Sequence, residues 1–356
     1  MSVFKPPLGE GVGGGQMKHI VIIGGGIAGI ETACALTDAG HWVTVIEKEA
    51  KSGGKLNNWS YLFPDFTPVE EIRNSLQEKN SEKDFTILTG TEIETVQRLN
   101  GKFSIKTTGS QQLEANALVI ATGYELFDAR RKEEYGYKIY DRVVTSADLE
   151  EMLKPGGDLT VAEGKVPKRI AFVHCVGSRD EKSGNHYCSK VCCITGVKQA
   201  IELKQRFSDA EIFCFYMDLR MYGKHYEELY REAQEKYNIQ FIRGRLSEAS
   251  EKIDKSLLIK AEDTLSGRPL KMNVDLLVLL VGMEAGKGTA AAAASCAVNC
   301  EESGFLQTRD SFLNSNFSSQ EGIFLAGSCT APMSVNDTIL HARSAAMEVN
   351  NWLKGK

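Results

Sequence analysis

The first fifty residues predict a dinucleotide-binding fold. His19–Ile23 is a β-branched run typical of a buried strand, and the motif Gly24-Gly25-Gly26-Ile27-Ala28-Gly29 follows it at once. A helical stretch, Ile30 to Ala39, precedes a second strand, Trp42–Ile46, which ends at Glu47. Strand, G-x-G-x-x-G, helix, strand and acid together indicate a site where a helix N-terminus faces a pyrophosphate and the acid accepts hydrogen bonds from a ribose.

Later motifs favour FAD as the dinucleotide. Ser52-Gly53-Gly54-Lys55 lies where two-domain flavoproteins carry a glycine pair, and Leu118–Gly123 resembles their strand-ending A-T-G motif. Gly322–Gly327 resembles their late flavin motif, with Ser328 in place of the usual Asp. A final helix, expected over residues 338–353, would direct its positive N-terminal end at the flavin. The residues predicted to bind FAD are Gly24, Gly26, Ile27, Ala28, Gly29, Glu47, Lys48, Gly54, Lys55, Ile93, Ala121, Thr122, Gly123, Gly327, Ser328, Thr338 and Ile339.

Strands and helices alternate again after residue 168, which predicts a second parallel α/β unit. We therefore expect a flexible glycine-rich arm over 1–17, an FAD-binding domain formed by 18–160 and 282–356, and a second Rossmann-like domain over 161–281. No second G-x-G-x-x-G follows the strand Arg169–His174. The usual NAD(P)H site of the second domain is therefore disfavoured.

Composition excludes some partners and suggests a compartment. The formal net charge is −5 and the chain has no basic tract, which argues against nucleic-acid binding. No apolar run approaches the roughly 18 residues that a membrane helix needs. The start of the chain has no apolar segment of the secretory kind, so we expect a cytoplasmic protein. In that reducing setting, clustered cysteines tend to bind metal or to do redox chemistry.

Four of the nine cysteines, Cys175, Cys188, Cys192 and Cys193, have the spacing C-x12-C-x3-C-C. Thiolates at this density suit a [4Fe–4S] cluster. The spacing alone leaves open a redox disulfide, a zinc site or a set of buried free thiols. Two of the other cysteines, Cys34 and Cys214, fall in apolar segments and are expected in the core. The spacing assigns no role to Cys296, Cys300 and Cys329.

The cysteine segment His174–Cys193, with Ile194–Ala200 after it, resembles the A-type flavoprotein of heterodisulfide reductases. So do Tyr216–Arg220, Gly223–Glu228 and Phe241–Gly244, and the resemblance begins at about residue 18. It implies an α/β, thioredoxin-reductase-like flavoprotein with two Rossmann-like dinucleotide-binding domains. It also implies that the four clustered cysteines hold a [4Fe–4S] cluster.

The methanogen members of that family carry ferredoxin-type C-x2-C-x2-C-x3-C runs, and this sequence has none. It resembles the short form of the sulfur-oxidising heterodisulfide-reductase-like complex of bacteria. The resemblance implies B- and C-type partner subunits, a lipoate-binding protein as a further partner, and a homodimer, and it makes electron bifurcation unexpected. The alternatives are a component of a quinone-interacting oxidoreductase, an NAD(P)H-dependent disulfide reductase using Cys192 and Cys193, and a scaffold that holds FAD structurally.

Overall fold

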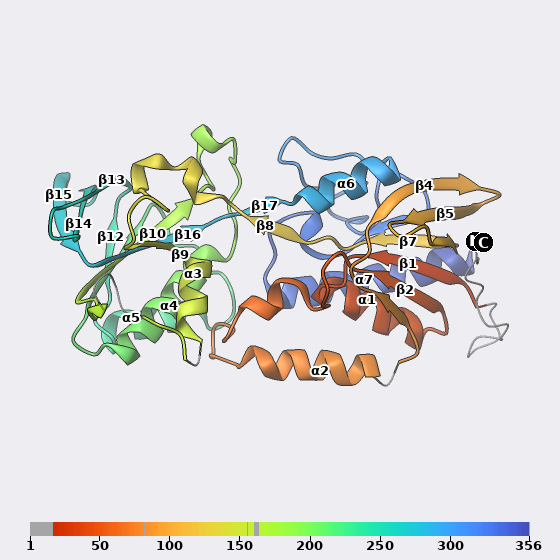
Figure 1. Cartoon of the computed structure of the whole chain (residues 1–356), viewed down its shortest axis with the longest axis horizontal. Coiled ribbons are helices and arrows are strands. Elements are labelled where there is room, and N and C mark those ends of the chain that lie inside the picture. Colours follow the sequence, from red (N-terminus) through yellow and green to blue (C-terminus); the bar gives the residue numbers. More distant parts are fainter. Residues whose placement is uncertain (1–16, 82, 155, 160–163, 356) are drawn as a thin grey trace. The chain divides into compact units, whose positions relative to one another are not determined.

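A computed structural model describes residues 17–81, 83–154, 156–159 and 164–355 (Figure 1). Of the predicted arm, residues 1–16 lie outside the described part. The described chain divides into two compact units. Unit 1 contains the described residues up to Asn57, Glu70–Glu125 and Glu284 onward, and unit 2 contains Asn58–Val69 and Leu126–Met283. The chain changes unit at 125/126, whereas the sequence suggested a boundary near residue 160.

Unit 1 is built on a five-stranded parallel sheet in the order β18-β7-β1-β2-β3. Its strands are β1 (His19–Ile23), β2 (Trp42–Ile46), β3 (Thr86–Leu88), β7 (Ala117–Ile120) and β18 (Ile323–Leu325). The central strand β1 is fully apolar except for its first residue, because both of its faces are covered.

The two faces of this sheet are covered by different layers. Helices α1 (Ile27–Asp38) and α7 (Val335–Lys354) lie side by side against the face that includes Ile20 and Ile22 (Figure 1). The opposite face, which includes Val21, packs on an antiparallel sheet and on α6 (Lys287–Cys296). That sheet consists of β4 (Ile93–Leu99), β5 (Lys102–Thr107) and β6 (Gln112–Ala115). A peripheral helix, α2, spans Val69–Ser81.

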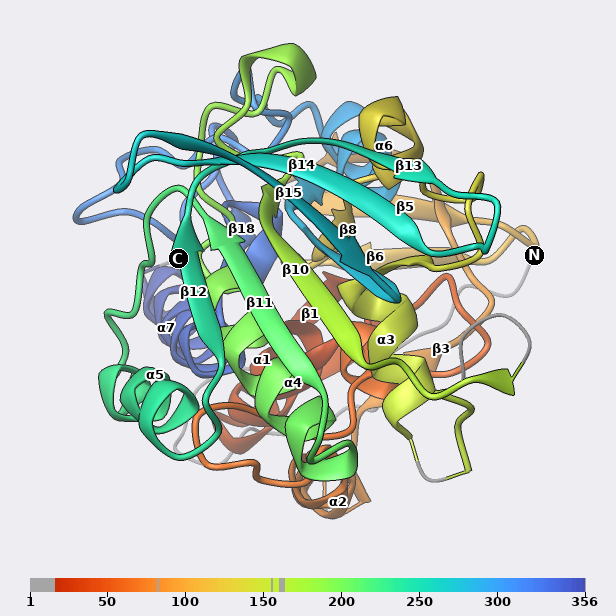
Figure 2. The ribbon, with the colours of Figure 1, turned by 90° about the vertical axis from the view of Figure 1, so that its left-hand side faces the viewer.

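Unit 2 repeats this plan around a parallel sheet in the order β12-β11-β10-β16-β9. Figure 2 shows β12, β11 and β10 side by side. Its strands are β9 (Val143–Thr145), β10 (Arg169–Val176), β11 (Glu211–Tyr216), β12 (Gln240–Arg243) and β16 (Leu276–Val281). One face packs on α3 (Ser146–Leu153), α4 (Cys192–Arg206) and α5 (Tyr226–Glu235). The other face packs on the antiparallel sheet of β13 (Leu246–Glu251), β14 (Leu257–Asp263) and β15 (Arg268–Val274).

The chain passes from one unit to the other within two short strands, β8 (Tyr124–Leu126) and β17 (Met283–Ala285), which pair with each other. The stretch after β8 contains α3 and the short strand β9. Strand β9 pairs in parallel with β16 and so brings this stretch into the sheet of unit 2.

The last helix begins earlier than the sequence suggested. It starts at Val335 rather than at 338, because Ser334 and Asp337 form a capping box at its N-terminus. Thr338 therefore lies in the second turn of α7, and its hydroxyl donates to the carbonyl of Ser334 at 2.8 Å.

Candidate functional site

The glycine turn of unit 1 joins the end of β1 to the start of α1. Gly24 has φ +110°, and a Cβ there would lie 2.4 Å from the carbonyl oxygen of Ala121. A Cβ on Gly29 would lie 1.9 Å from the carbonyl oxygen of Gly24. Both positions therefore require glycine, one for its conformation and its space and the other for close packing of helix on strand.

A second glycine turn meets the first. Gly53 pairs with Gly26 in a short parallel bridge, and a Cβ on Gly54 would lie 3.0 Å from the Cα of Gly26. Around Gly26 itself, an added Cβ would find no described atom closer than 3.9 Å, so its backbone is open to a ligand. Helix α1 has no side-chain cap and no acid in its first turn, which leaves its N-terminal N–H groups free for an anion. These features fit the pyrophosphate of a dinucleotide.

Glu47 is buried at the end of β2 and already holds the glycine turn. Its Oε2 accepts a hydrogen bond from the Gly25 N–H at 2.7 Å, and its Oε1 accepts one from the Glu49 N–H at 2.8 Å. A carboxylate has about four acceptor positions, so two remain for a ribose.

The later flavin motifs converge within unit 1. A Cβ on Gly327, which has φ +74°, would lie 2.7 Å from Ala28 Cβ and 3.2 Å from Thr338 Cγ2. Gly327 thus lies between α1 and α7, and its N–H donates to Nδ1 of His341 at 2.9 Å. Burial lowers the pKa of His341, which keeps this ring neutral and able to accept. Sequence reasoning missed His341, since only the fold brings it to the motif.

The threonine of the A-T-G motif contacts Thr289. The hydroxyl of Thr122 lies 2.8 Å from that of Thr289, and Thr289 is fully buried at the start of α6. Thr289 also donates to the carbonyl oxygen of Gly123 at 3.4 Å. Thr289 therefore fixes the strand end that carries the predicted contacts, although no sequence motif marked it.

The remaining predicted contacts vary in exposure. Ser328 is buried in the short turn that follows Gly327, and Ile93 is half-buried at the start of β4 against the unit 1 core. Lys48 and Lys55 are exposed, and Lys48 pairs with Glu49 at 3.9 Å. The lysines therefore differ from the glycines, because nothing in the described protein holds them at a ligand site.

The cysteine site of unit 2 lies at the end of β10 and the start of α4. Cys175 is buried and has φ +60°, beside a register irregularity of β10 between Val173 and Val176. Cys192 and Cys193 are the first residues of α4, and both are buried. The Cys192 thiol hydrogen-bonds to the sulfurs of Cys175 and Cys193, so three of the four predicted ligands are in contact.

These contacts shift the pKa values of the three thiols in different directions. The hydrogen bond from Cys192 lowers the pKa of Cys175 and of Cys193, and the same bonds raise the pKa of Cys192 well above its ordinary value. The imidazole of His174 lowers the pKa of Cys193 further. Cys188, the fourth predicted ligand, is partly exposed, and its sulfur accepts a hydrogen bond from the Lys190 N–H at 3.3 Å.

Several buried polar atoms around these cysteines have no hydrogen-bond partner of normal geometry in the described part of the chain. They are both ring nitrogens of His174, Oγ of Ser178, Nη1 of Arg179 and Oγ1 of Thr195. A buried polar group without a partner costs about 1–3 kcal/mol, so native proteins rarely leave five such atoms together. Their clustering fits an anionic group that would accept their hydrogen bonds.

The donor set fits an iron–sulfur cluster better than a single ion. Among the described residues, no three side chains of His, Cys, Asp or Glu surround one point as ligands of one ion would. A [4Fe–4S] cluster is held by four thiolates, each on a different iron, so its ligands need not share one point. Three thiols lie together here and Cys188 is in the same loop, so four thiolates are available to such a group.

None of the other cysteines is a predicted ligand, although Cys214 lies in the same core cluster as Cys192 and Cys193. Cys34 and Cys214 are in the core, as expected, and burial raises the pKa of Cys214. Burial also raises the pKa of Cys296 and of Cys329 to about 12, which makes both poor ligands. Cys300 is exposed.

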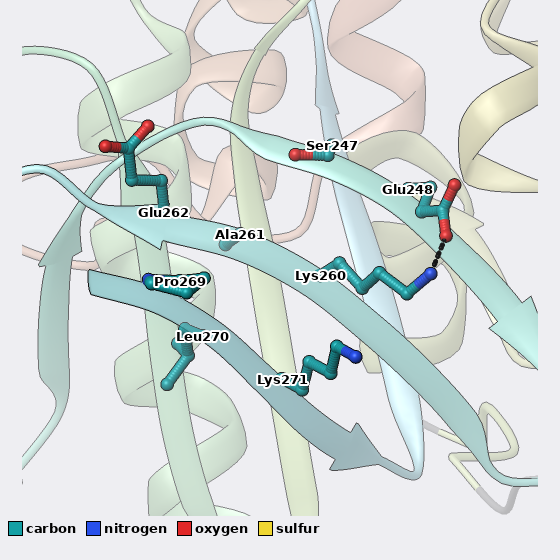
Figure 3. Close-up of a pocket in the computed structure, with 8 residues that line it drawn as sticks. All are labelled: Ser247, Glu248, Lys260, Ala261, Glu262, Pro269, Leu270 and Lys271. Atoms are coloured by element: carbon teal, nitrogen blue, oxygen red, sulfur yellow. Dashed lines mark hydrogen bonds and ion pairs between the residues drawn. The ribbon is translucent and has the colours of Figure 1, made fainter. Parts of the chain in front are cut away.

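A surface hollow of about 500 Å³ lies on the antiparallel sheet of unit 2 (Figure 3). Its wall includes Lys271 and the ion pair of Lys260 with Glu248 (Figure 3). None of its lining residues is a predicted ligand. No helix in the described part of the protein is long and apolar enough to cross a membrane.

Comparison with solved structures defines the fold. Thioredoxin reductase of T. acidophilum superposes with a TM-score of 0.64 at 18% identity, covering 94% of this chain and 98% of the other. That of Lactococcus lactis gives 0.66 at 16% identity, covering 95% and 100%. The fold is therefore the thioredoxin-reductase-like one with two dinucleotide-binding domains, as the sequence predicted. Residues 5–155 match the family model of pyridine nucleotide-disulphide oxidoreductases.

In sequence, the chain is similar to the heterodisulfide reductase A subunits. It is 40% identical over 243 residues to the A subunit of the H2/formate:CoB-CoM heterodisulfide,ferredoxin reductase of Methanococcus maripaludis, covering 67% of this chain and 37% of the relative. It is 30% identical to an iron-sulfur A subunit of the CoB–CoM heterodisulfide reductase of Methanopyrus kandleri, covering 94% and 64%. The chain thus spans between about a third and two thirds of these relatives.

Proposed function

We propose that this protein is an FAD- and [4Fe–4S]-containing electron-transfer component of a heterodisulfide-reductase-like complex. The observation that carries the proposal is the contact of Cys175, Cys192 and Cys193 amid five buried polar atoms that have no hydrogen-bond partner of normal geometry among the described residues. Its homology to the iron-sulfur A subunit of the Methanopyrus kandleri reductase supports the same assignment.

The residues divide the work between the two units. Gly26, Gly54 and the N-terminus of α1 would bind the pyrophosphate of FAD, and Glu47 would bind its ribose. Cys175, Cys188, Cys192 and Cys193 would hold the cluster. Bound flavin would exchange electrons in pairs or singly, and a cluster exchanges single electrons. The N-terminal end of α7 would favour negative charge on a flavin near Thr338.

At the finer level, we propose the short form found in sulfur-oxidising complexes, acting in the cytoplasm. Its partners would be B- and C-type subunits and a lipoate-binding protein, with the chain itself a homodimer. A place in a quinone-interacting oxidoreductase is the nearest alternative. Comparing reduction of this protein by its native partner subunits with its reduction by a quinone-linked partner would distinguish the two complexes.

A second candidate is an NAD(P)H-dependent disulfide reductase that uses Cys192 and Cys193 as redox thiols. The contact of these two sulfurs favours it, as does the family model matched by residues 5–155. Rapid bleaching of the flavin by NAD(P)H in iron-free protein would support this function over electron relay.

The deciding experiment measures iron, acid-labile sulfide and FAD in anaerobically purified protein. We expect about four irons per chain, as a [4Fe–4S] cluster requires, and their loss in the double variant Cys192→Ser, Cys193→Ser while FAD remains. Cys296→Ala, a buried cysteine of unit 1, is the matched control and should keep its iron. FAD-containing wild-type protein without iron would exclude the cluster.

A further inference from the structure

Arg179 is placed beside the cysteines by its backbone. It follows Cys175 by four residues and has φ +53°, a conformation that residues other than glycine seldom adopt. Its N–H donates to the carbonyl oxygen of Tyr187 at 2.9 Å, which joins it to the strand-like return of the loop just before Cys188. The loop therefore fixes the point from which the Arg179 side chain starts.

The guanidinium is held at its other end by Asp218. Nη2 of Arg179 donates to Oδ2 of Asp218 at 2.7 Å, and this bond raises the pKa of Arg179. The carbonyl oxygen of the same Asp218 lies 3.8 Å from Sγ of Cys193. Asp218 therefore connects the arginine to one predicted ligand through two different atoms.

The free end of the guanidinium faces another predicted ligand. Nη1 is buried and has no hydrogen-bond partner of normal geometry among the described residues. The side chain lies close enough to Cys175 for the two groups to interact directly. A charged donor left unpaired in the interior is costly, whereas an anion at this position would accept from it.

We propose that Arg179 raises the reduction potential of an iron–sulfur cluster held by these cysteines. The inference rests on the proposed function. Reduction adds one negative charge to a cluster, and potentials of such groups depend on net charge and on hydrogen bonds to their sulfurs. A fixed positive charge with one spare N–H beside the Cys175 sulfur therefore favours the reduced state.

The test is a redox titration of the cluster, followed by electron paramagnetic resonance, in wild type, Arg179→Met and Arg179→Lys. We expect Arg179→Met to lower the reduced-to-oxidised ratio at a fixed potential at least tenfold, which is about 59 mV for one electron. Arg179→Lys keeps the charge and should shift the ratio less. Arg243→Met is the matched control, because Arg243 pairs with Asp218 at 3.5 Å but is 48% exposed.

An unchanged midpoint in Arg179→Met, with iron retained, would overturn the inference. So would an equal shift in Arg243→Met, which would indicate a general effect of surface charge. Loss of iron from both Arg179 variants would show instead that the residue supports the structure of the loop. Iron-free wild-type protein would contradict the proposed function itself, and the iron assay reports that before any titration begins.

Discussion

Replacing Lys198 by Met should destabilise unit 2 strongly. Lys198 lies on α4 and is fully buried, although lysine is rarely found inside a protein. Its Nζ lies 2.9 Å from Oε1 of Glu150, 3.0 Å from the carbonyl oxygen of Tyr61 and 3.3 Å from Oε2 of Glu202. The ring of Trp59 lies 5.8 Å from the same nitrogen. One cation thus serves two buried carboxylates and anchors the short segment 58–69.

The magnitude follows from what the substitution leaves behind. Without Lys198, the carboxylate of Glu150 remains buried without its cation, and the carboxyl group of Glu202 loses the cation that pairs with it. Breaking a buried pair in this way costs about 3–5 kcal/mol, a large share of the roughly 5–15 kcal/mol that stabilises a folded protein. For a unit of this size, the midpoint of thermal unfolding should fall by about 6–20 °C.

Urea unfolding followed by circular dichroism measures this loss, and two further variants make the test specific. Glu150→Gln added to Lys198→Met removes one uncompensated charge and should recover about 1–3 kcal/mol. Lys236→Met breaks an exposed pair with Glu232 and should change nothing measurable. The reasoning is refuted if Lys198→Met unfolds at the same urea concentration as Lys236→Met.

Two other predictions concern one residue of each unit. Burial raises the pKa of Glu202 to about 7, so the folded protein keeps a proton that the unfolded chain has already released above about pH 4.5. Stability should therefore fall as the pH rises from about 4.5 to 7, and Glu202→Gln should flatten this dependence and gain up to about 3 kcal/mol at pH 8. Identical urea profiles across this range in wild type and variant would count against it. In unit 1, Gly29→Ala places a Cβ 1.9 Å from the carbonyl oxygen of Gly24 and should reduce FAD content and cost about 1–3 kcal/mol. Gly288→Ala meets no described atom within 4 Å and is the control, and equal FAD content in both would refute the packing argument.

The sequence predicted the elements whose signals are local. The β-branched runs of β1 and β2 and the glycines between them have the same bounds and turn geometry in the structure. The early start of α7 was also readable, because Ser334 and Asp337 have the spacing of a capping box. By contrast, β9 is a three-residue strand without alternation, and only its pairing with β16 makes it part of a sheet.

Contacts across long sequence separations were beyond prediction. Lys198 reads as a surface position on an amphipathic helix, yet its partners Glu150 and Tyr61 are 48 and 137 residues away. His341 and Thr289 reach the flavin motifs in the same manner. The cysteine spacing was visible in the sequence, but only the fold brings Cys175 to Cys192 and places around them buried donors with no well-formed hydrogen bond in the described chain.

The two units share one arrangement of strands and helices but differ in the connection that follows the central strand. In each unit, a central strand leads into a helix that packs on one face of the sheet, and the chain then forms the next strand of that sheet. This is β1-α1-β2 in unit 1 and β10-α4-β11 in unit 2. Unit 1 leaves its strand through a glycine turn directly into α1. In unit 2, residues 177–191 lie between the end of β10 and the start of α4, and α4 begins with two cysteines.

Both helices begin without a side-chain cap and without an acid in the first turn. A helix N-terminus of this kind stabilises whatever anion is placed on it. In unit 1, Gly26 leaves room there for the phosphates of a dinucleotide. In unit 2, Cys192 and Cys193 occupy the first two helical positions, next to the positive end of the helix dipole. Under the proposed function, the same electrostatic feature would suit a nucleotide in unit 1 and thiolate ligands in unit 2.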